Sequence, residues 1–447
     1  MTAPVPPFTW PSPARAWFAV TALSIANLFS FLDRTVLNLL VAPIKTDLLL
    51  SDTQIGLLQG AAFGVFYTLM ILPFGWVADN GNRVRLVGLG LAFWSIMTAL
   101  CGLAGSFTEL FVARIGVGFG EATLAAAGAS IISDYFPAKS RTLPLSVLTL
   151  VASTGAGVAL IAGGLVGGAA LASGAITVPV FGALQPWQIV FLAVGLPGLV
   201  WAMLFLAVRE PARLEVAAES ATWAELFRFV STRRKVVGLH FFGYCFYNTF
   251  GYGAAGWLPV YFMRTHGWSL TDVGLRYGAI YLIFAIVGGL AGGALAKFFL
   301  SQGRANANLL AIAVGNALLT IPAVLTTQMP SGWISLALAA PLITLLVFPS
   351  GPSLATIQEI TPNRLRGRMT ALYYAVTNLV GISLGALLVG ALTDYVFRSE
   401  AAVGNSISLA GLVLCPTGAF IIFLAARARL VLESLELESL ELEKSKA

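Results

Sequence analysis

Residues 53–85 read TQIGLLQGAAFGVFYTLMILPFGWVADNGNRVR, an apolar run followed by a short charged segment. Residues 53–78 contain no Asp, Glu, Lys or Arg. A helix needs about 20 apolar residues to cross the hydrocarbon core of a bilayer, so this run is long enough to span a membrane. Asp79, Arg83 and Arg85 then mark the point where the chain returns to water. The same alternation recurs along the chain and predicts a helical membrane protein.

Twelve such apolar runs divide the 447 residues. The composition agrees, because 58% of the residues are hydrophobic, only 10% are charged and the mean hydropathy is +0.86. These values exclude a soluble enzyme, a secreted module and a DNA-binding domain. We therefore predict an all-α integral membrane protein whose twelve transmembrane helices form two pseudo-symmetric six-helix bundles. The predicted spans are residues 14–42, 53–78, 86–105, 109–136, 143–171, 187–208, 236–263, 271–299, 306–328, 332–359, 367–397 and 403–426.

The basic residues are unevenly distributed across this topology. Of the 26 Lys and Arg residues, 20 lie on the side that carries both termini, three on the other side and three within spans. Because positive residues concentrate in cytoplasmic loops, we expect both termini in the cytoplasm, with the protein in a bacterial inner (plasma) membrane. The imbalance also explains the net charge of +6 without a nucleic-acid partner.

The predicted spans separate into two halves around a charged segment. The segment 209–235 holds ten of the 46 charged residues. Its apolar residues have the spacing of an amphipathic helix on the membrane face, although a solvated linker fits equally well. These residues are Trp223, Leu226, Phe227 and Val230. We expect an N-terminal bundle at 1–208, a cytoplasmic linker at 209–235, a C-terminal bundle at 236–428 and a mobile low-complexity cytoplasmic tail at 429–447.

The charged segment after the second span contains a Gly-x-x-x-Asp pattern followed by Arg, at Gly75, Asp79 and Arg83. The glycine permits close helix packing, and the charged groups can pair at the membrane edge. Six plus six spans, a charged central loop and this pattern resemble the major facilitator superfamily over nearly the whole chain. The resemblance implies that Gly75, Asp79 and Arg83 form a conformational latch. The usual form of the pattern is not complete here, since it differs at Asn80, Asn82 and Val84.

Two further strings are similar to those of spinster-like transporters. They are FLDR at residues 31–34 and RIGVGFGEA at residues 114–122, followed by DYFP at residues 134–137. Related forms of the strings occur among organic-anion symporters. The resemblance implies a monomeric secondary transporter whose halves rock about a central site. The chain lacks a Walker-type phosphate loop, and we expect no enzymatic activity, no cofactor and no metal site.

Four ionisable residues lie deep within the first and fourth spans: Asp33, Arg34, Arg114 and Glu121. Each costs about 2.5–3.5 kcal/mol at the centre of a membrane helix, so these residues need partners or a wet cavity. Their depths predict two pairs, Asp33 with Arg114 and Arg34 with Glu121. Because an apolar site favours the neutral form of a carboxyl group, we expect Asp33 and Glu121 to exchange protons while Arg34 holds or releases them. The alternative is a static network that joins two helices.

The second half supplies the predicted substrate contacts. Nine of the eleven tyrosines lie there, and aromatic and polar side chains together suit an amphipathic ligand. Arg276 has no obvious acidic partner in the second-half spans, so we expect it to bind a phosphate or carboxylate. Alternatively, it faces water near the outer end of its span. The predicted substrate-binding residues are Arg34, Tyr244, Tyr247, Asn248, Arg276, Tyr281, Tyr373 and Thr377.

These features favour a proton-coupled secondary transporter of an amphipathic, anionic, lipid-like substrate, such as a lysolipid or sphingoid phosphate. A proton-coupled symporter of a small organic anion, such as a sugar acid, is the alternative within the same class. From other classes, a lipid-modifying membrane enzyme and a non-transporting receptor remain open. The partners we expect are therefore the substrate, protons and the bilayer.

Overall fold

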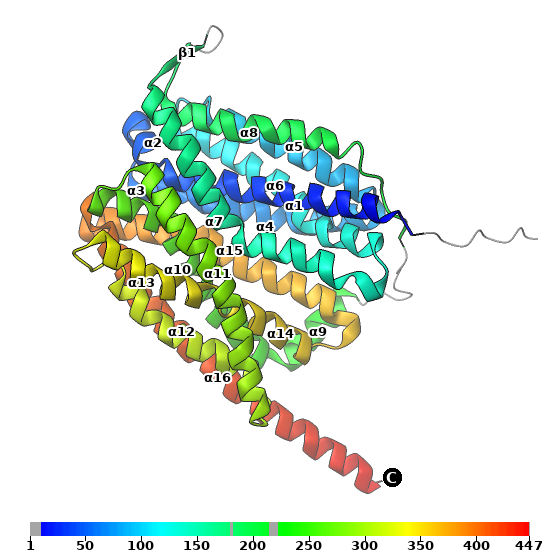
Figure 1. Cartoon of the computed structure of the whole chain (residues 1–447). Helices are drawn as coiled ribbons and strands as arrows, with labels where there is room; N and C mark the ends of the chain where they lie inside the picture. Colours follow the sequence, from blue (N-terminus) through cyan, green and yellow to red (C-terminus); the bar gives the residue numbers. More distant parts are fainter. Residues whose placement is uncertain (1–9, 179–181, 214–221, 447) are drawn as a thin grey trace, which may run out of the picture.

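The computed structural model describes residues 10–178, 182–213 and 222–446 and is almost wholly helical (Figure 1). The spans of the first half are α1 (Pro13–Leu39), α3 with α4 (Asp52–Gln59 and Ala61–Asn80), α5 (Arg83–Cys101), α6 (Phe107–Tyr135), α7 (Thr142–Ser173) and α8 (Pro186–Leu204). Those of the second half are α10 (Arg234–His266), α11 (Leu270–Ser301), α12 (Ala307–Leu325), α13 with α14 (Gly332–Val347 and Ser350–Ile360), α15 (Arg366–Ala391) and α16 (Val403–Lys446).

In the described part of the chain, 11 helical segments are long and apolar enough to cross a membrane. The twelfth span is α10, which carries polar residues such as His240 and Asn248 and packs against α15 and α16 within the second half. The predicted twelve-helix architecture is therefore confirmed.

Two predicted spans are each broken into two helices. Gly60 separates α3 from α4 because it packs directly on α15, where an added Cβ would lie 2.7 Å from the carbonyl oxygen of Ile382. The break between α13 and α14 falls at Phe348 and Pro349, where proline cannot donate a helical hydrogen bond. The first predicted span also ends early, at Leu39, and a separate short helix, α2 (Val41–Leu48), follows it.

Shorter elements join the spans. A hairpin of two antiparallel strands, β1 (Ile176–Val178) and β2 (Gly182–Leu184), lies between α7 and α8 and was not predicted. A π-helical turn, η3 (Leu392–Phe397), extends α15. Within the predicted linker, α9 (Trp223–Thr232) buries Leu226, while residues 214–221 lie outside the described residues. The tail that we expected to be mobile continues α16 to Lys446, since Leu and Glu favour helix.

The two halves contact each other through several helices. The most extensive contacts are those of α7 with α11 and of α15 with α3 and α4, and α1 also packs against α10. Glycine allows α7 and α11 to approach closely, because a Cβ added at Gly164 would lie 2.7 Å from the Cα of Gly274. The glycines at these crossings therefore permit direct backbone contact between the halves.

A network of charged groups seals the end of the molecule opposite the termini, where α2 and α3 lie in Figure 1. Asp52, whose side chain is fully buried, accepts from Arg264 at 2.7 and 2.8 Å and from Lys45 at 2.7 Å. Lys45 also pairs with Glu400 at 2.8 Å. Asp394 accepts from the backbone N–H and the hydroxyl of Thr53, both at 2.6 Å, and so caps α3 from the other half. We call Lys45, Asp52, Arg264, Asp394 and Glu400 the outer seal, because the distribution of basic residues predicts that this end faces away from the cytoplasm.

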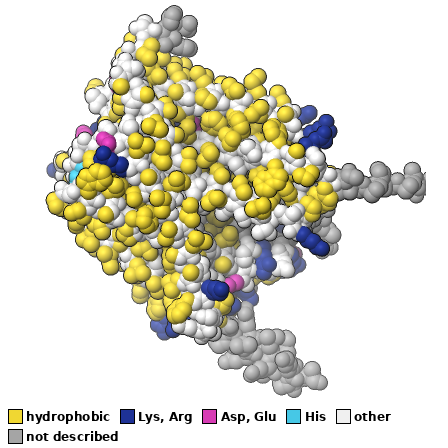
Figure 2. Space-filling view, in the orientation of Figure 1, with side chains coloured by type: hydrophobic (Ala, Val, Ile, Leu, Met, Phe, Trp, Pro, Cys, Tyr) yellow, Lys and Arg dark blue, Asp and Glu magenta, His cyan; other side chains and the backbone are white. Residues whose placement is uncertain are grey.

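The outer surface matches a membrane environment. Figure 2 shows apolar side chains over most of the visible face, while Lys and Arg gather toward the end that carries the termini. Exposed apolar residues such as Val200 and Phe420 lie on the spans themselves. The chain is therefore a multi-pass integral membrane protein.

Candidate functional site

The predicted pair between Arg34 on α1 and Glu121 on α6 is formed. The Nε and Nη2 atoms of Arg34 donate to Glu121 Oε2 at 2.9 and 2.6 Å. Ser30, one helical turn before Arg34, donates its hydroxyl to the same oxygen at 2.6 Å. The Glu121 side chain is fully buried, whereas 25% of the Arg34 side chain is exposed. The other carboxylate oxygen, Glu121 Oε1, has no hydrogen-bond partner among the described residues.

The predicted ion pair between Asp33 and Arg114 is not formed. Arg114 donates to the backbone carbonyl oxygen of Asp33 at 3.3 Å and to that of Leu58 at 3.4 Å, and no ion pair joins it to the Asp33 carboxylate. Successive residues point about 100° apart around a helix, so the side chains of Asp33 and Arg34 leave α1 in different directions. Asp33 is 2% exposed, and its Oδ1 atom lacks a hydrogen-bond partner in the described part of the chain.

Phe63 on α4 contacts both Arg34 and Arg114 and was missed by the sequence analysis. Its ring centroid is 4.3 Å from the guanidinium carbon of Arg34 and 5.4 Å from that of Arg114. Tyr67 stacks on Phe63 at 5.2 Å and contacts Arg34 at 4.8 Å. The negative faces of these rings stabilise the guanidinium groups. No signal within the apolar run marks either aromatic residue as special.

Three predicted substrate residues lie in a packed cluster in the second half. His240 Nε2 is 2.7 Å from Ser353 Oγ, which is 2.6 Å from the hydroxyl of Tyr373. Tyr244 and Tyr247 pack beside this chain with ring centroids 5.1 Å apart. Tyr373, Tyr244 and Tyr247 are each at most 9% exposed, so they do not face open space in this conformation.

The remaining predicted contacts of the second half lie on α10, α11 and α15. Asn248 donates to the backbone carbonyl oxygen of Thr377, which is itself buried. Tyr281 is partly exposed. Tyr252, which is not among the predicted contacts, packs against a buried apolar cluster that consists mainly of first-half residues.

Arg276 is not the unpaired cation that the sequence predicted. Its Nη2 atom is 2.8 Å from Asp272 Oδ1, one helical turn earlier on α11. Its guanidinium carbon also lies over the rings of Trp268 and Trp333, at 4.9 and 4.6 Å. The side chain is 37% exposed, near the end of α11 that begins at Leu270. Its charge is therefore already neutralised by Asp272, and we no longer assign it to substrate binding.

The three predicted latch residues have unequal surroundings. Arg83 pairs with Asp134 and, at 2.7 Å, with Glu210, so it joins α5 to α6 and to the chain after α8. Asp79 is exposed and forms no ion pair with any described residue; its backbone carbonyl accepts from Arg213. Nothing lies within 4 Å of a Cβ added at Gly75. In this conformation Arg83 alone forms a charged contact.

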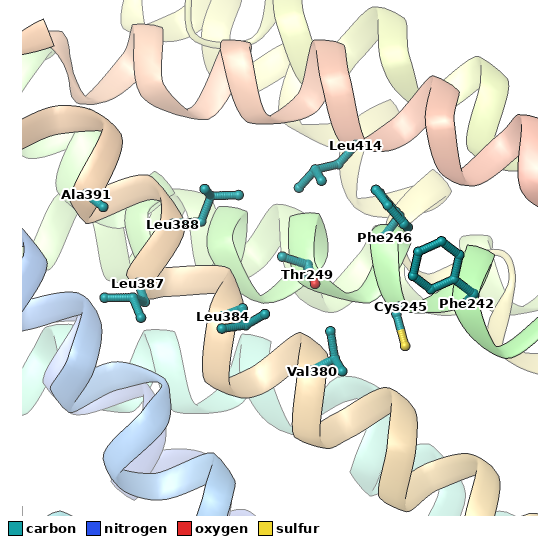
Figure 3. Close-up of a pocket in the computed structure, with 10 residues that line it drawn as sticks. All are labelled: Phe242, Cys245, Phe246, Thr249, Val380, Leu384, Leu387, Leu388, Ala391 and Leu414. Carbon is teal, nitrogen blue, oxygen red and sulfur yellow. The ribbon is translucent and has the colours of Figure 1, made fainter. Parts of the chain in front are cut away.

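A separate cavity of about 470 Å³ lies between α10, α15 and α16 (Figure 3). Apart from Thr249 and Cys245, its lining is apolar. Two of the lining residues, Phe242 and Leu384, are exposed on the surface that would face lipid. It contains none of the predicted site residues. The residues that the structure describes also contain no group of three His, Cys, Asp or Glu side chains able to hold a metal ion.

Comparison with known proteins decides the family, because residues 23–386 match the Major Facilitator Superfamily. The chain belongs to this superfamily. A relative within it, an MFS-type efflux pump of Mycolicibacterium smegmatis (strain ATCC 700084 / mc(2)155), is 31% identical over 86% of this chain and 85% of its own length. The probable L-galactonate transporter of Escherichia coli (strain K12) is 27% identical over 64% of this chain and 63% of its own length.

Solved structures of superfamily members refine the assignment. A bacterial homolog of the human lysosomal transporter Spinster, in an inward-facing and unoccupied conformation, matches with a TM-score of 0.80 and 25% identity, over 94% of this chain and 98% of that one. Its inward-facing and occupied form matches with a TM-score of 0.72, 25% identity and coverage of 94% and 97%. The chain is thus a spinster-like facilitator superfamily transporter and not an enzyme.

Proposed function

We propose that this transporter couples proton movement to the transport of an amphipathic, anionic, lipid-like substrate. The observation that carries the proposal is the state of Glu121: one carboxylate oxygen is held by Arg34 and Ser30, and the other is buried without a partner. An unpartnered buried oxygen is costly and is a natural acceptor for a proton. A purely structural pair would be expected to satisfy both oxygens.

Protonation would change which contacts Arg34 makes. A proton on Glu121 removes the negative charge that holds the guanidinium, and Arg34, already a quarter exposed, then becomes available to a substrate anion. Asp33, buried beside this pair with an unpartnered Oδ1, is the second candidate proton acceptor. Arg114, held by two backbone carbonyls, supplies a fixed positive charge.

The transport cycle would be alternating access between two end states. The outer seal closes one end of the molecule, so we assign the structure to the inward-facing state, with both termini in the cytoplasm as the basic residues indicate. Opening the outer end requires α7 to move against α11 and α15 against α3 and α4. We propose that Arg83 stabilises the cytoplasmic end of the first half as part of a latch with Gly75 and Asp79, and that the transporter acts as a monomer.

Aromatic side chains around the proposed anion site support a lipid-like substrate. Arg34 lies 6.0 Å from the ring of Phe31, in addition to its contacts with Phe63 and Tyr67. Such surfaces accommodate an apolar chain beside a charged group. We therefore propose that Arg34 binds the anionic group, and that Tyr281 and Asn248 contact the rest of the substrate. Tyr244, Tyr247, Tyr373 and Thr377 would reach it only if the second half rearranges.

A small organic anion is the second candidate. Relatives of this chain are named as probable L-galactonate and probable galactarate/D-glucarate transporters, at 27% and 23% identity. A sugar acid would use the same cation, Arg34, and would place its hydroxyl groups against tyrosines instead of packing an apolar chain.

Proteoliposome uptake separates these candidates. Vesicles with an imposed pH gradient would be offered a lysophospholipid or a sugar acid such as galactonate. Gradient-driven uptake of the lysophospholipid alone supports the proposal, and uptake of galactonate alone supports the second candidate. Transport of either compound that is insensitive to the gradient would contradict proton coupling.

A further inference from the structure

We propose that a groove on the second half binds the phosphate of an anionic phospholipid. The groove, about 490 Å³ in volume, lies at the end of the molecule that carries the termini, between the loop from α11 to α12 and the part of α16 that leaves the membrane. Its lining consists of Gly303, Arg304, Ala305, Asn306, Leu310, Phe423, Arg427 and Leu430. We call it the headgroup groove.

Two arginines from different segments give the headgroup groove its charge. Arg304 and Arg427 are both exposed, and neither forms an ion pair with a carboxylate in the described part of the chain. Arg304 lies over the ring of Phe299 at 5.6 Å, which orders its guanidinium without neutralising it. Two guanidinium groups that line one cavity match the several oxygen atoms of a phosphate.

The backbone around these arginines is fixed. Gly303 adopts a φ of +75°, a left-handed conformation that suits glycine and turns the loop sharply after α11. Asn306 is 6% exposed and donates its side-chain N–H to the carbonyl oxygen of Ala426 at 3.0 Å. Since Ala426 precedes Arg427, this bond ties the loop that carries Arg304 to the helix that carries Arg427. The two charges are therefore held in a defined relation.

Apolar residues distinguish a lipid from a soluble phosphate. Phe423, Arg427 and Leu430 follow one another at i, i+4 and i+7 and share a face of α16. Phe423 is 43% exposed and Leu430 is 46% exposed. Further into the membrane, Phe420 continues the exposed apolar surface of α16. A lipid whose phosphate binds Arg304 and Arg427 can lay an acyl chain along this surface, which a free phosphate would leave unused.

The groove is independent of the proposed transport site. It is built from α12, α16 and the loop before α12, and none of the larger contacts between the halves, which involve α1, α3, α4, α7, α10, α11 and α15, uses these elements. Lipid binding here would hold the loop before α12 and the adjoining part of α16 against the membrane surface, where anionic lipids attract basic residues. The inference does not depend on the substrate or on proton coupling.

Native mass spectrometry of the full-length protein in detergent tests the proposal with phosphatidylglycerol and phosphatidylcholine as probes. We expect one bound phosphatidylglycerol to be retained about 25-fold more than phosphatidylcholine, since each of the two arginines near the surface contributes about a factor of five. The double variant Arg304→Gln/Arg427→Gln should lose this preference. The control Arg15→Gln/Arg228→Gln removes the same charge from exposed positions on the same side and should keep it.

Thermal unfolding provides the second measurement. Phosphatidylglycerol should raise the melting temperature of the wild type and the control variant but not of the double variant, which should still fold and transport. Equal retention of the two lipids by the wild type, or undiminished phosphatidylglycerol binding by a folded double variant, would overturn the proposal. Stabilisation by millimolar inorganic phosphate equal to that by the lipid would also overturn it.

Discussion

Arg34 and Glu121 meet at a single carboxylate oxygen, Oε2, and leave the second oxygen of Glu121 buried without a partner. The pair joins α1 to α6, and a quarter of the Arg34 side chain stays exposed. This asymmetry makes the two oxygens chemically different: one is held by charge, and the other is the oxygen that we propose to accept a proton. The first prediction follows from it.

Glu121→Gln should remove proton coupling and keep the fold. The amide preserves the shape of the side chain but neither binds a proton nor neutralises Arg34, so gradient-driven uptake should fall by at least about tenfold, as expected for loss of an essential ionisable group. Counterflow exchange, which needs no net proton movement, should persist. Glu109→Gln alters an exposed carboxylate on the same helix and should leave both assays unchanged. Unaltered gradient-driven uptake in Glu121→Gln contradicts the proposed role.

Asp33→Asn should separate stability from transport. The buried carboxyl has an unpartnered oxygen, so replacing it with a neutral amide should leave the melting temperature unchanged or raise it by a few degrees, about 1 kcal/mol. Gradient-driven uptake should decrease in the same variant. If Asp33 were mainly structural, the variant would instead unfold several degrees earlier, which a thermal melt followed by tryptophan fluorescence would detect.

Disrupting the outer seal should shift the protein toward an outward-open state. Arg264→Gln leaves the buried carboxylate of Asp52 with one cation fewer, and losing a partner of a buried pair costs about 3–5 kcal/mol. Spin labels at Leu49→Cys and Ser399→Cys should report a longer distance in Arg264→Gln. Arg398→Gln is the control, because Arg398 forms no ion pair with any described residue. An unchanged distance distribution would show that the seal does not set the conformation.

Gly164→Leu should hinder closure of the outer end by a steric route. The glycine backbone approaches Gly274 too closely for any side chain, so the larger residue should separate α7 from α11. The same labels should then report an opened outer end, and uptake should fall. Gly293→Ala places a methyl group where nothing lies within 4 Å and should behave as wild type. If Gly164→Leu gave the same distance between the labels as the wild type, the contact between α7 and α11 would not control the outer end.

The sequence predicted the depth of charged residues in the membrane better than the directions in which their side chains leave the helices. Counting residues along α1 and α6 placed Arg34 at a depth between Arg114 and Glu121, which predicted its pair with Glu121, and that pair is present. The same count could not tell that Arg114 donates to the backbone carbonyl of Asp33 and not to its carboxylate. Side-chain direction depends on how each helix is rotated against its neighbours, and a depth count carries no information about that rotation.

Contacts between distant parts of the chain were likewise beyond the sequence. Arg276 was taken as unpaired although Asp272 lies one turn away, and its stacking on Trp333 involves a residue on another span. The outer seal joins Asp52 to Arg264, which are more than two hundred positions apart. Periodicity locates helices well, but only the packing of the two halves brings such charges together.

Asp52 forms ion pairs with both Lys45 and Arg264. The backbone N–H of the next residue, Thr53, donates to Asp394. Lys45, Arg264 and Asp394 all bind the first turn of α3, so the loss of any one of these contacts weakens the other two. A partly opened form would leave the carboxylate of Asp52 buried without a cation. Such a form should be short-lived. A carrier must never offer ions a continuous path from one compartment to the other. Because this end closes around a single carboxylate, partly opened forms that could leak ions should be rarely populated.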